Sequence, residues 1–197
     1  MNNEYVIFDL DGTLIDSWES ITLCLTRTVE AVGCESVPSS FFSDYDISHI
    51  GKAFHQCHDR FVKEMGWREF KSLSDKIYIR DCLDKVKTLE PGVMMLNQTL
   101  EKGMDCVVLT NKFQMAADII CTMLFGPTTF KHIIGRKGIR MIKPYKYAIN
   151  AITRCGLDIA CCAGYVGDSE TDRIMAEKMG VRYHSINELS STISLYQ

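Results

Sequence analysis

Short apolar runs alternate with helical patterns from residue 89 onward, and this alternation limits the fold more than any other feature. Strand-like runs lie at 106–110, 130–134, 163–167 and 181–185. Helical patterns lie at 93–103, 115–125, 145–156 and 169–180. Strands that alternate with helices of ten or more residues predict a parallel sheet with helices on both faces. The opening run EYVIFDL is expected to join that sheet.

The stretch from 15 to 88 lacks this alternation of strands and helices. It contains helical patterns at 18–33, 50–66 and 73–89 and no convincing strand. Ser17 is an expected N-cap, and Gly33 and Gly66 are expected helix stops. The sequence therefore predicts an α/β core, residues 1–14 and 89–197, interrupted after its first strand by an all-helical insertion, residues 15–88. In the core, Pro144 is expected in the first turn of the helix that follows it.

Composition narrows the class of protein. The chain has 197 residues and a formal net charge of −3. Its nine cysteines are scattered, without the spacing of a disulfide framework. No basic stripe marks a nucleic-acid partner, and the apolar runs are too short to cross a bilayer. The odd number of cysteines and the absence of a secretory signal favour reduced thiols in the cytoplasm. A monomer or homodimer is expected.

Polar residues suited to phosphate or metal chemistry follow most of the predicted strands. They are Asp9 and Asp11 after the first strand, Thr110-Asn111-Lys112 after the second, Asp168 and Asp172 after the strand at 163–167, and Lys143 before a helix. Ligands of parallel α/β sheets bind outside the carboxyl ends of the strands. These side chains are therefore expected in one crevice.

The charges of this set suggest a reaction. Asp168 and Asp172 share a helix face, and Asp9 and Asp11 point the same way in an extended chain. Carboxylates gathered in one crevice repel one another, and Mg²⁺ beside a substrate phosphate would offset that repulsion. With Lys143 as a fixed cation, the set describes phosphoryl transfer with an aspartate nucleophile.

Each feature also has a simpler interpretation. Asp-Gly is common in turns, acids at a helix N-terminus complement its dipole, and Lys-Pro occurs in ordinary loops. The combination of all four segments is what favours the chemical interpretation.

FDLDGTLIDS, LTNK, KP and GDSETD, in that order, resemble the four motifs of the haloacid dehalogenase superfamily. The sequence is most similar to the phosphoglycolate-phosphatase-like group, in which a helical cap follows the first strand. The resemblance implies a Rossmann-like core, a cap at 15–88, and a magnesium-dependent phosphatase that hydrolyses a small phosphorylated metabolite through an aspartyl-phosphate.

The resemblance also implies residue roles. Asp9 would be the nucleophile and a magnesium ligand, and Asp11 would be the general acid and base and ligate magnesium through its carbonyl. Gly12 would allow the turn that sets both acids. An aspartate at position 11 favours a phosphate-ester hydrolase or a phosphomutase over a dehalogenase.

The other implied roles concern the phosphoryl group and the metal. Thr110 and the backbone N–H of Asn111 would hold the phosphoryl oxygens, and Lys143 would neutralise the nucleophile. Asp168 would bind Mg²⁺ directly, with Asp172 as a further ligand or acting through water.

Substrate selection is expected to involve His49 and Lys52 in the cap and Arg140 in the basic loop 135–143. That loop could equally be a solvated basic surface. Three other functions stay open: a sugar phosphomutase of the same superfamily, a receiver-like phosphoacceptor and a catalytically silent binding protein.

Overall fold

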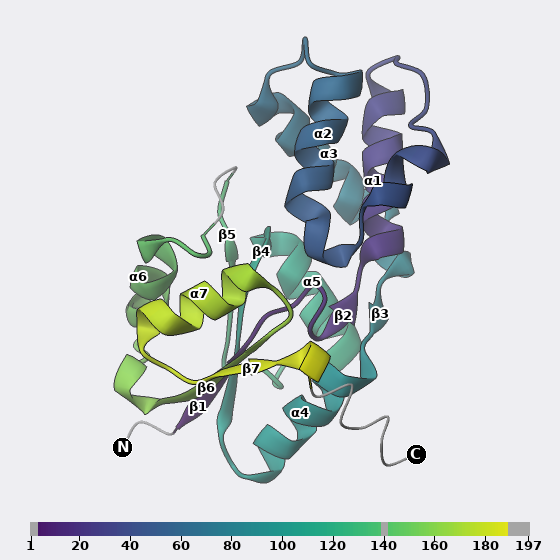
Figure 1. Cartoon of the computed structure of the whole chain (residues 1–197). Helices are drawn as coiled ribbons and strands as arrows, with labels where there is room; N and C mark the ends of the chain where they lie inside the picture. The colour runs from purple at the N-terminus through teal and green to yellow at the C-terminus, as the bar shows by residue number, and fades with distance from the viewer. Residues whose placement is uncertain (1–3, 139–141, 189–197) are drawn as a thin grey trace. The chain divides into compact units, whose positions relative to one another are not determined.

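The structure is a computed structural model that describes residues 4–138 and 142–188. The chain divides into two compact units. One comprises Met1–Ile15 with Thr88–Gln197, and the other comprises Asp16–Lys87. They are called the core unit and the helical unit below (Figure 1).

The core unit contains a five-stranded sheet in which every neighbouring pair is parallel. The strand order is β5-β4-β1-β6-β7. The strands are β1 (Tyr5–Phe8), β4 (Asp105–Phe113), β5 (His132–Arg136), β6 (Cys162–Gly167) and β7 (Tyr183–Ser185). The predicted parallel sheet is thus confirmed. Strand β4 runs three residues beyond its predicted end, because Phe113 still pairs with Arg136 of β5.

Helices cover both faces of the sheet (Figure 1). They are α4 (Glu90–Glu101), α5 (Gln114–Phe125), α6 (Lys146–Arg154) and α7 (Glu170–Met179), with a short 3₁₀ turn, η4 (Ile159–Cys161), before β6. Helices α6 and α7 bury Ile152 and Met175 in one cluster with Tyr5 and Ile7 of β1. Because both faces are covered, β1 is an uninterrupted apolar run rather than an alternating one.

Helix α6 begins later than the sequence predicts. Its first residue is Lys146 and its N-cap is Tyr145, whose backbone is extended. Pro144 therefore precedes the helix instead of occupying its first turn. Pro91, in contrast, lies in the first turn of α4, where a missing N–H costs no helical hydrogen bond.

The helical unit consists of α1 (Trp18–Ala31), α2 (Ile50–Phe61) and α3 (Trp67–Asp81). Three 3₁₀ segments join them: η1 (Ser39–Asp44), η2 (Ile47–His49) and η3 (Leu83–Lys85). Ser17 stands at the N-cap of α1 without a side-chain capping hydrogen bond.

The expectation that Gly66 ends a helix was wrong. Helix α2 ends at Phe61, and Gly66 is the N-cap of α3, which starts at Trp67 rather than at 73. The backbone of Gly66 is extended, with φ −61° and ψ 138°, as an N-cap requires.

Two short strands that the sequence did not reveal lie where the chain passes between the units. Strands β2 (Ile15–Asp16) and β3 (Lys87–Thr88) pair in a separate two-stranded sheet. Each has two residues, too few for a periodic pattern. None of the helices in the described part of the chain is long and apolar enough to span a membrane.

Candidate active site

The turn after β1 places Asp9 at the carboxyl end of the sheet. The Asp9 N–H donates to the carbonyl of Val166 in β6, at 2.9 Å, and Asp9 as a residue is 6% exposed. Gly12 follows with a φ of +83°, and a Cβ there would lie 2.2 Å from Oδ2 of Asp168. Only glycine therefore allows this turn and lets the Asp168 carboxylate lie against it.

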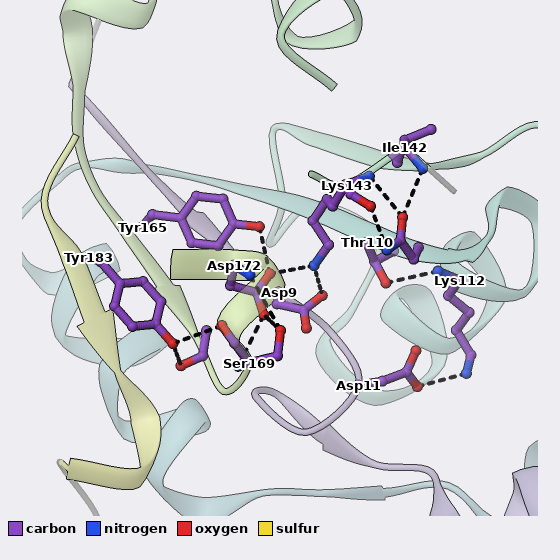
Figure 2. Close-up of polar contacts among 12 residues, drawn as sticks. Asp9, Asp11, Thr110, Lys112, Ile142, Lys143, Tyr165, Ser169, Asp172 and Tyr183 are labelled. Carbon is purple, nitrogen blue, oxygen red and sulfur yellow. Dashed lines mark hydrogen bonds and ion pairs between the residues drawn. The ribbon is translucent and has the colours of Figure 1, made fainter. Parts of the chain in front are cut away.

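Lys143 joins two of these acids. Its Nζ donates to Oδ1 of Asp9 and to Oδ1 of Asp172, each at 2.6 Å (Figure 2). The lysine is 3% exposed and Asp172 is fully buried. The structure thus brings together three residues from distant parts of the sequence, with the ammonium between two carboxylates.

The carboxylate of Asp172 is held by further donors from its own surroundings. The hydroxyl of Tyr165 donates to Oδ1 at 2.9 Å, and the hydroxyl of Ser169 donates to Oδ2 at 2.5 Å. Ser169 and Asp172 also form a capping box at the start of α7. Sequence reasoning gave neither Tyr165 nor Ser169 a role, although the Ser-x-x-Asp spacing is a recognisable capping signal.

Burial and charge shift the pKa values within this cluster in different directions. Burial, and then the negative charge of Asp172, raise the pKa of Asp9 well above its usual value and that of Asp168 to about 6. Burial opposes the charge on Lys143, yet Asp172 and Asp9 raise its pKa. Burial also opposes the charge on Asp172, but Lys143, Ser169 and Tyr165 lower its pKa. Lys143 and Asp172 therefore form the stable ion pair.

The same acids could hold a cation. Among the described residues, Asp9, Asp168 and Asp172 offer oxygens that lie within 4.8 Å of one another. Burial, and then the charge of Asp172, raise the pKa values of Asp9 and Asp168, and a divalent cation would favour the ionised form of both carboxylates. Both oxygens of Asp172 already accept direct hydrogen bonds. Asp9 and Asp168 are therefore the better direct ligands.

The end of β4 supplies three polar residues that point to different partners. The buried hydroxyl of Thr110 accepts from the N–H of Lys112 at 3.1 Å. Nζ of Lys112 donates to Oδ1 of Asp11 at 2.7 Å, with little exposure of either side chain. The carboxamide of Asn111 contacts the backbone of Ile142 and Lys143. Sequence reasoning assigned no partner to Lys112 and no task to the Asn111 side chain.

Two of the expected substrate-selecting residues, His49 and Lys52, belong to the helical unit. His49 is the N-cap of α2 in the helical unit, where its Nδ1 lies 2.9 Å from Oδ1 of Asp46, and Lys52 is exposed on α2. Arg140 falls outside the described residues. In the same basic loop Arg136 is buried, donates to the carbonyl of Gly138 and faces the ring of Phe113.

Comparison with known proteins relates this chain to one family. A sequence model described as haloacid dehalogenase-like hydrolase matches residues 6–186. A phosphoglycolate phosphatase of Neisseria meningitidis is 29% identical over 184 residues, covering 89% of this chain and 76% of the relative. One of Aquifex aeolicus is 27% identical over 130 residues, covering 66% and 59%.

Solved structures share the fold. A predicted phosphoglycolate phosphatase from Haemophilus somnus superimposes with a TM-score of 0.73 at 20% identity, covering 93% of this chain and 84% of that one. A haloacid dehalogenase-like hydrolase from Streptococcus pneumoniae gives 0.70 at 20% identity, with the same coverage. The family match spans the sheet, both flanking layers and all four clustered segments. The chain belongs to the haloacid dehalogenase-like hydrolase family.

Proposed function

We propose that this chain is a magnesium-dependent phosphatase that hydrolyses a small phosphorylated metabolite through an aspartyl-phosphate on Asp9. The observation that carries the proposal is the position of the Lys143 ammonium, 2.6 Å from both Asp9 and Asp172 at the carboxyl ends of β1 and β6. A buried carboxylate beside a fixed cation is suited to attack an anionic phosphoryl group, because the cation reduces the repulsion between them.

In the first step an oxygen of Asp9 forms a bond to phosphorus while the bond from phosphorus to the leaving oxygen breaks. Asp11 donates a proton to that leaving oxygen. Thr110, the backbone N–H of Asn111 and Lys143 are the proposed donors to the phosphoryl oxygens. The contact of Lys112 with Asp11 fixes the direction of the acid's side chain.

In the second step water attacks the phosphorus of the aspartyl-phosphate. Asp11 takes a proton from that water, the bond between Asp9 and phosphorus breaks, and inorganic phosphate leaves. Asp11 thereby regains the proton that it gave to the leaving oxygen, and Asp9 is again a free carboxylate, so the catalytic cycle closes.

The residues fit a magnesium ion. Asp9, Asp168 and the carbonyl of Asp11 would hold it, with Asp172 beside Lys143 as a ligand or acting through water. When bound, the ion would supply positive charge to the transferring phosphoryl oxygens.

The helical unit is the proposed cap, and a small metabolite is the proposed substrate class. The curated relatives described above are phosphoglycolate phosphatases, which supports a compact substrate with a second anionic group. His49, Lys52 and Arg140 are the residues we propose for its selection.

A panel of phosphorylated metabolites tests the function. Phosphate release is measured with Mg²⁺ and with a chelator, in the absence of any bisphosphate activator, for the wild type and for Asp9→Asn. We expect release that needs Mg²⁺ and falls by roughly three orders of magnitude or more in Asp9→Asn. Isomerised sugar phosphate that appears only with a bisphosphate would instead identify a phosphomutase. Turnover that Asp9→Asn leaves unchanged would refute the nucleophile.

A further inference from the structure

The side-chain carboxamide of Asn111 forms hydrogen bonds with the backbone of Ile142 and Lys143. Its Oδ1 accepts from the N–H of Ile142 at 2.8 Å and from the N–H of Lys143 at 2.9 Å, and its Nδ2 donates to the carbonyl of Lys143 at 3.2 Å. All of these partners belong to two consecutive residues more than thirty positions away in sequence.

Apart from its hydrogen bonds with Asn111, the described backbone of Ile142 and Lys143 makes one backbone hydrogen bond, from the N–H of Tyr145 to the carbonyl of Ile142 at 2.9 Å. Ile142 and Lys143 lie outside every helix and strand, so no ladder of backbone hydrogen bonds fixes them. A lysine side chain has a long, flexible stem, and holding its end in one place costs conformational entropy. An ammonium can keep two contacts at 2.6 Å only if its own Cα is well placed.

We propose that Asn111 is a positioning residue for Lys143. Its side chain fixes the backbone of residues 142–143, and this holds the ammonium between Asp9 and Asp172. Its place at the end of β4, an internal strand of the sheet, gives the clamp a rigid base. The consequence for catalysis rests on the proposed function, whereas the consequence for the position of Lys143 does not.

Gln114 offers a matched control. Its carboxamide also bridges backbone groups, since Nε2 donates to the carbonyl of Ile133 at 2.9 Å and Oε1 accepts from the N–H of Gly135 at 2.8 Å. These groups belong to β5 and do not carry Lys143. Asn111→Leu and Gln114→Met therefore each remove a clamp with little change in side-chain volume, but only the first releases Lys143.

The first measurement is the reactivity of the Lys143 amine. Folded, metal-free protein is treated with formaldehyde and cyanoborohydride, and methylation at Lys143 is followed by peptide mass spectrometry, with the exposed Lys52 as internal reference. We expect Asn111→Leu to be labelled at Lys143 roughly tenfold faster than the wild type, because buried amines react slowly and the clamp is lost. Gln114→Met should react like the wild type.

The second measurement is hydrolysis of p-nitrophenyl phosphate with Mg²⁺. We expect Asn111→Leu to lower kcat about tenfold or more, and Gln114→Met to stay within about twofold of the wild type. If the wild type releases no phosphate from any substrate, the proposed function fails, but the labelling comparison still decides the role of Asn111.

Labelling of Asn111→Leu at the wild-type rate would overturn the inference, as would equal acceleration in Gln114→Met. If Asn111→Leu does not fold, Asn111→Asp replaces it. This variant keeps acceptors for the two N–H groups and loses the donor to the Lys143 carbonyl. It should be labelled faster than the wild type, and an unchanged rate would overturn the inference.

Discussion

Asp172 is a fully buried carboxylate whose charge is balanced by direct contacts. Lys143, Tyr165 and Ser169 donate to its two oxygens, and together they lower its pKa in spite of burial. Asp168, four residues earlier, has no such set of donors in the described part of the chain, and its pKa is raised to about 6. We therefore propose different tasks for the two acids of this motif: Asp172 orients Lys143, and Asp168 would bind a cation.

Replacing Tyr165 with phenylalanine should destabilise the protein. The change removes the hydroxyl that donates to Asp172 and leaves a buried carboxylate oxygen with one donor fewer. Hydrogen bonds to charged groups contribute about 1.5–3 kcal/mol, so the free energy of unfolding should fall by about that amount in urea titrations.

Tyr5→Phe is the control for this substitution. Tyr5 is as buried as Tyr165, but its hydroxyl has only the weakly bonding thiol of Cys162 beside it and no carboxylate partner among the described residues. Its removal should change stability little or increase it. A Tyr165→Phe protein as stable as Tyr5→Phe would contradict the importance of the hydrogen bond to Asp172.

The sequence identifies the residues of the site better than it identifies their contacts. Asp9, Thr110 and Asp168 could be predicted because each lies at the end of a predicted strand, and Lys143 because it precedes a predicted helix in a Lys-Pro segment. The pairing of Lys112 with Asp11 could not, since it joins side chains 101 positions apart and depends on their rotamers. The grip of Asn111 on Lys143 was missed for the same reason.

At the scale of elements, the turn between β1 and β2 depends on a close approach. Gly12 combines a φ of +83° with contact to the carboxylate of Asp168. The start of α4 packs as tightly, because a Cβ on Gly92 would lie 2.0 Å from the carbonyl oxygen of Thr13. The glycines thus let two elements approach the turn that carries Asp9.

We expect Gly12→Ala to lower the free energy of unfolding more than a glycine-to-alanine change at a position where the left-handed backbone conformation is the sole constraint. Gly103 is that control, with a φ of +73° and open space around it. Gly103→Ala should cost about 1–2 kcal/mol, the usual cost of a left-handed non-glycine residue. Gly12→Ala should exceed this and should also weaken Mg²⁺ binding, measured by calorimetry, because Asp168 must move.

Equal unfolding free energies and unchanged Mg²⁺ affinity in the Gly12→Ala and Gly103→Ala proteins would show that the approach of Asp168 to the turn is unimportant.

Element boundaries were the weakest part of the sequence prediction. Helices with clear apolar periodicity, such as α5 and α7, were found within one residue. The prediction for Gly66 was wrong because a glycine can end one helix or precede the next, and packing decides between these two positions. Strands β2 and β3 were missed because their pairing partner lies across the helical unit in sequence.

For the whole molecule, the cluster of acids would link folding to the proposed metal binding. Asp168 has a pKa of about 6 in the folded metal-free protein, above its usual value. The folded state therefore holds that proton more tightly than the unfolded state. As the pH rises from about 4 to about 6, the free energy of unfolding therefore falls. In this range the Asp168 carboxyl ionises readily in the unfolded state, whereas its ionisation in the folded state costs free energy.

Asp168→Asn should therefore stabilise the metal-free protein and weaken its response to magnesium. In a chelator at pH 7.5 we expect its free energy of unfolding to exceed that of the wild type by roughly 1–2 kcal/mol, and the difference should vanish near pH 4. With saturating Mg²⁺ the wild type should become the more stable of the two proteins, because Mg²⁺ binding stabilises the wild type more than Asp168→Asn.

A variant less stable than the wild type in chelator at pH 7.5 would contradict the charge repulsion at Asp168. An equal gain from Mg²⁺ in both proteins would contradict its place among the ligands.

Covalent phosphorylation of Asp9 is the central claim, and Asp11→Asn gives the most direct test. p-Nitrophenolate leaves without help from an acid, so this variant should still form the aspartyl-phosphate but should hydrolyse it slowly. Stopped-flow absorbance should show a burst of about one p-nitrophenolate per site. Borohydride reduction of the quenched protein should then convert residue 9 to homoserine, read by mass spectrometry. Hydrolysis by the wild type together with no burst in the variant, or with phosphorylation at another residue, would contradict the account.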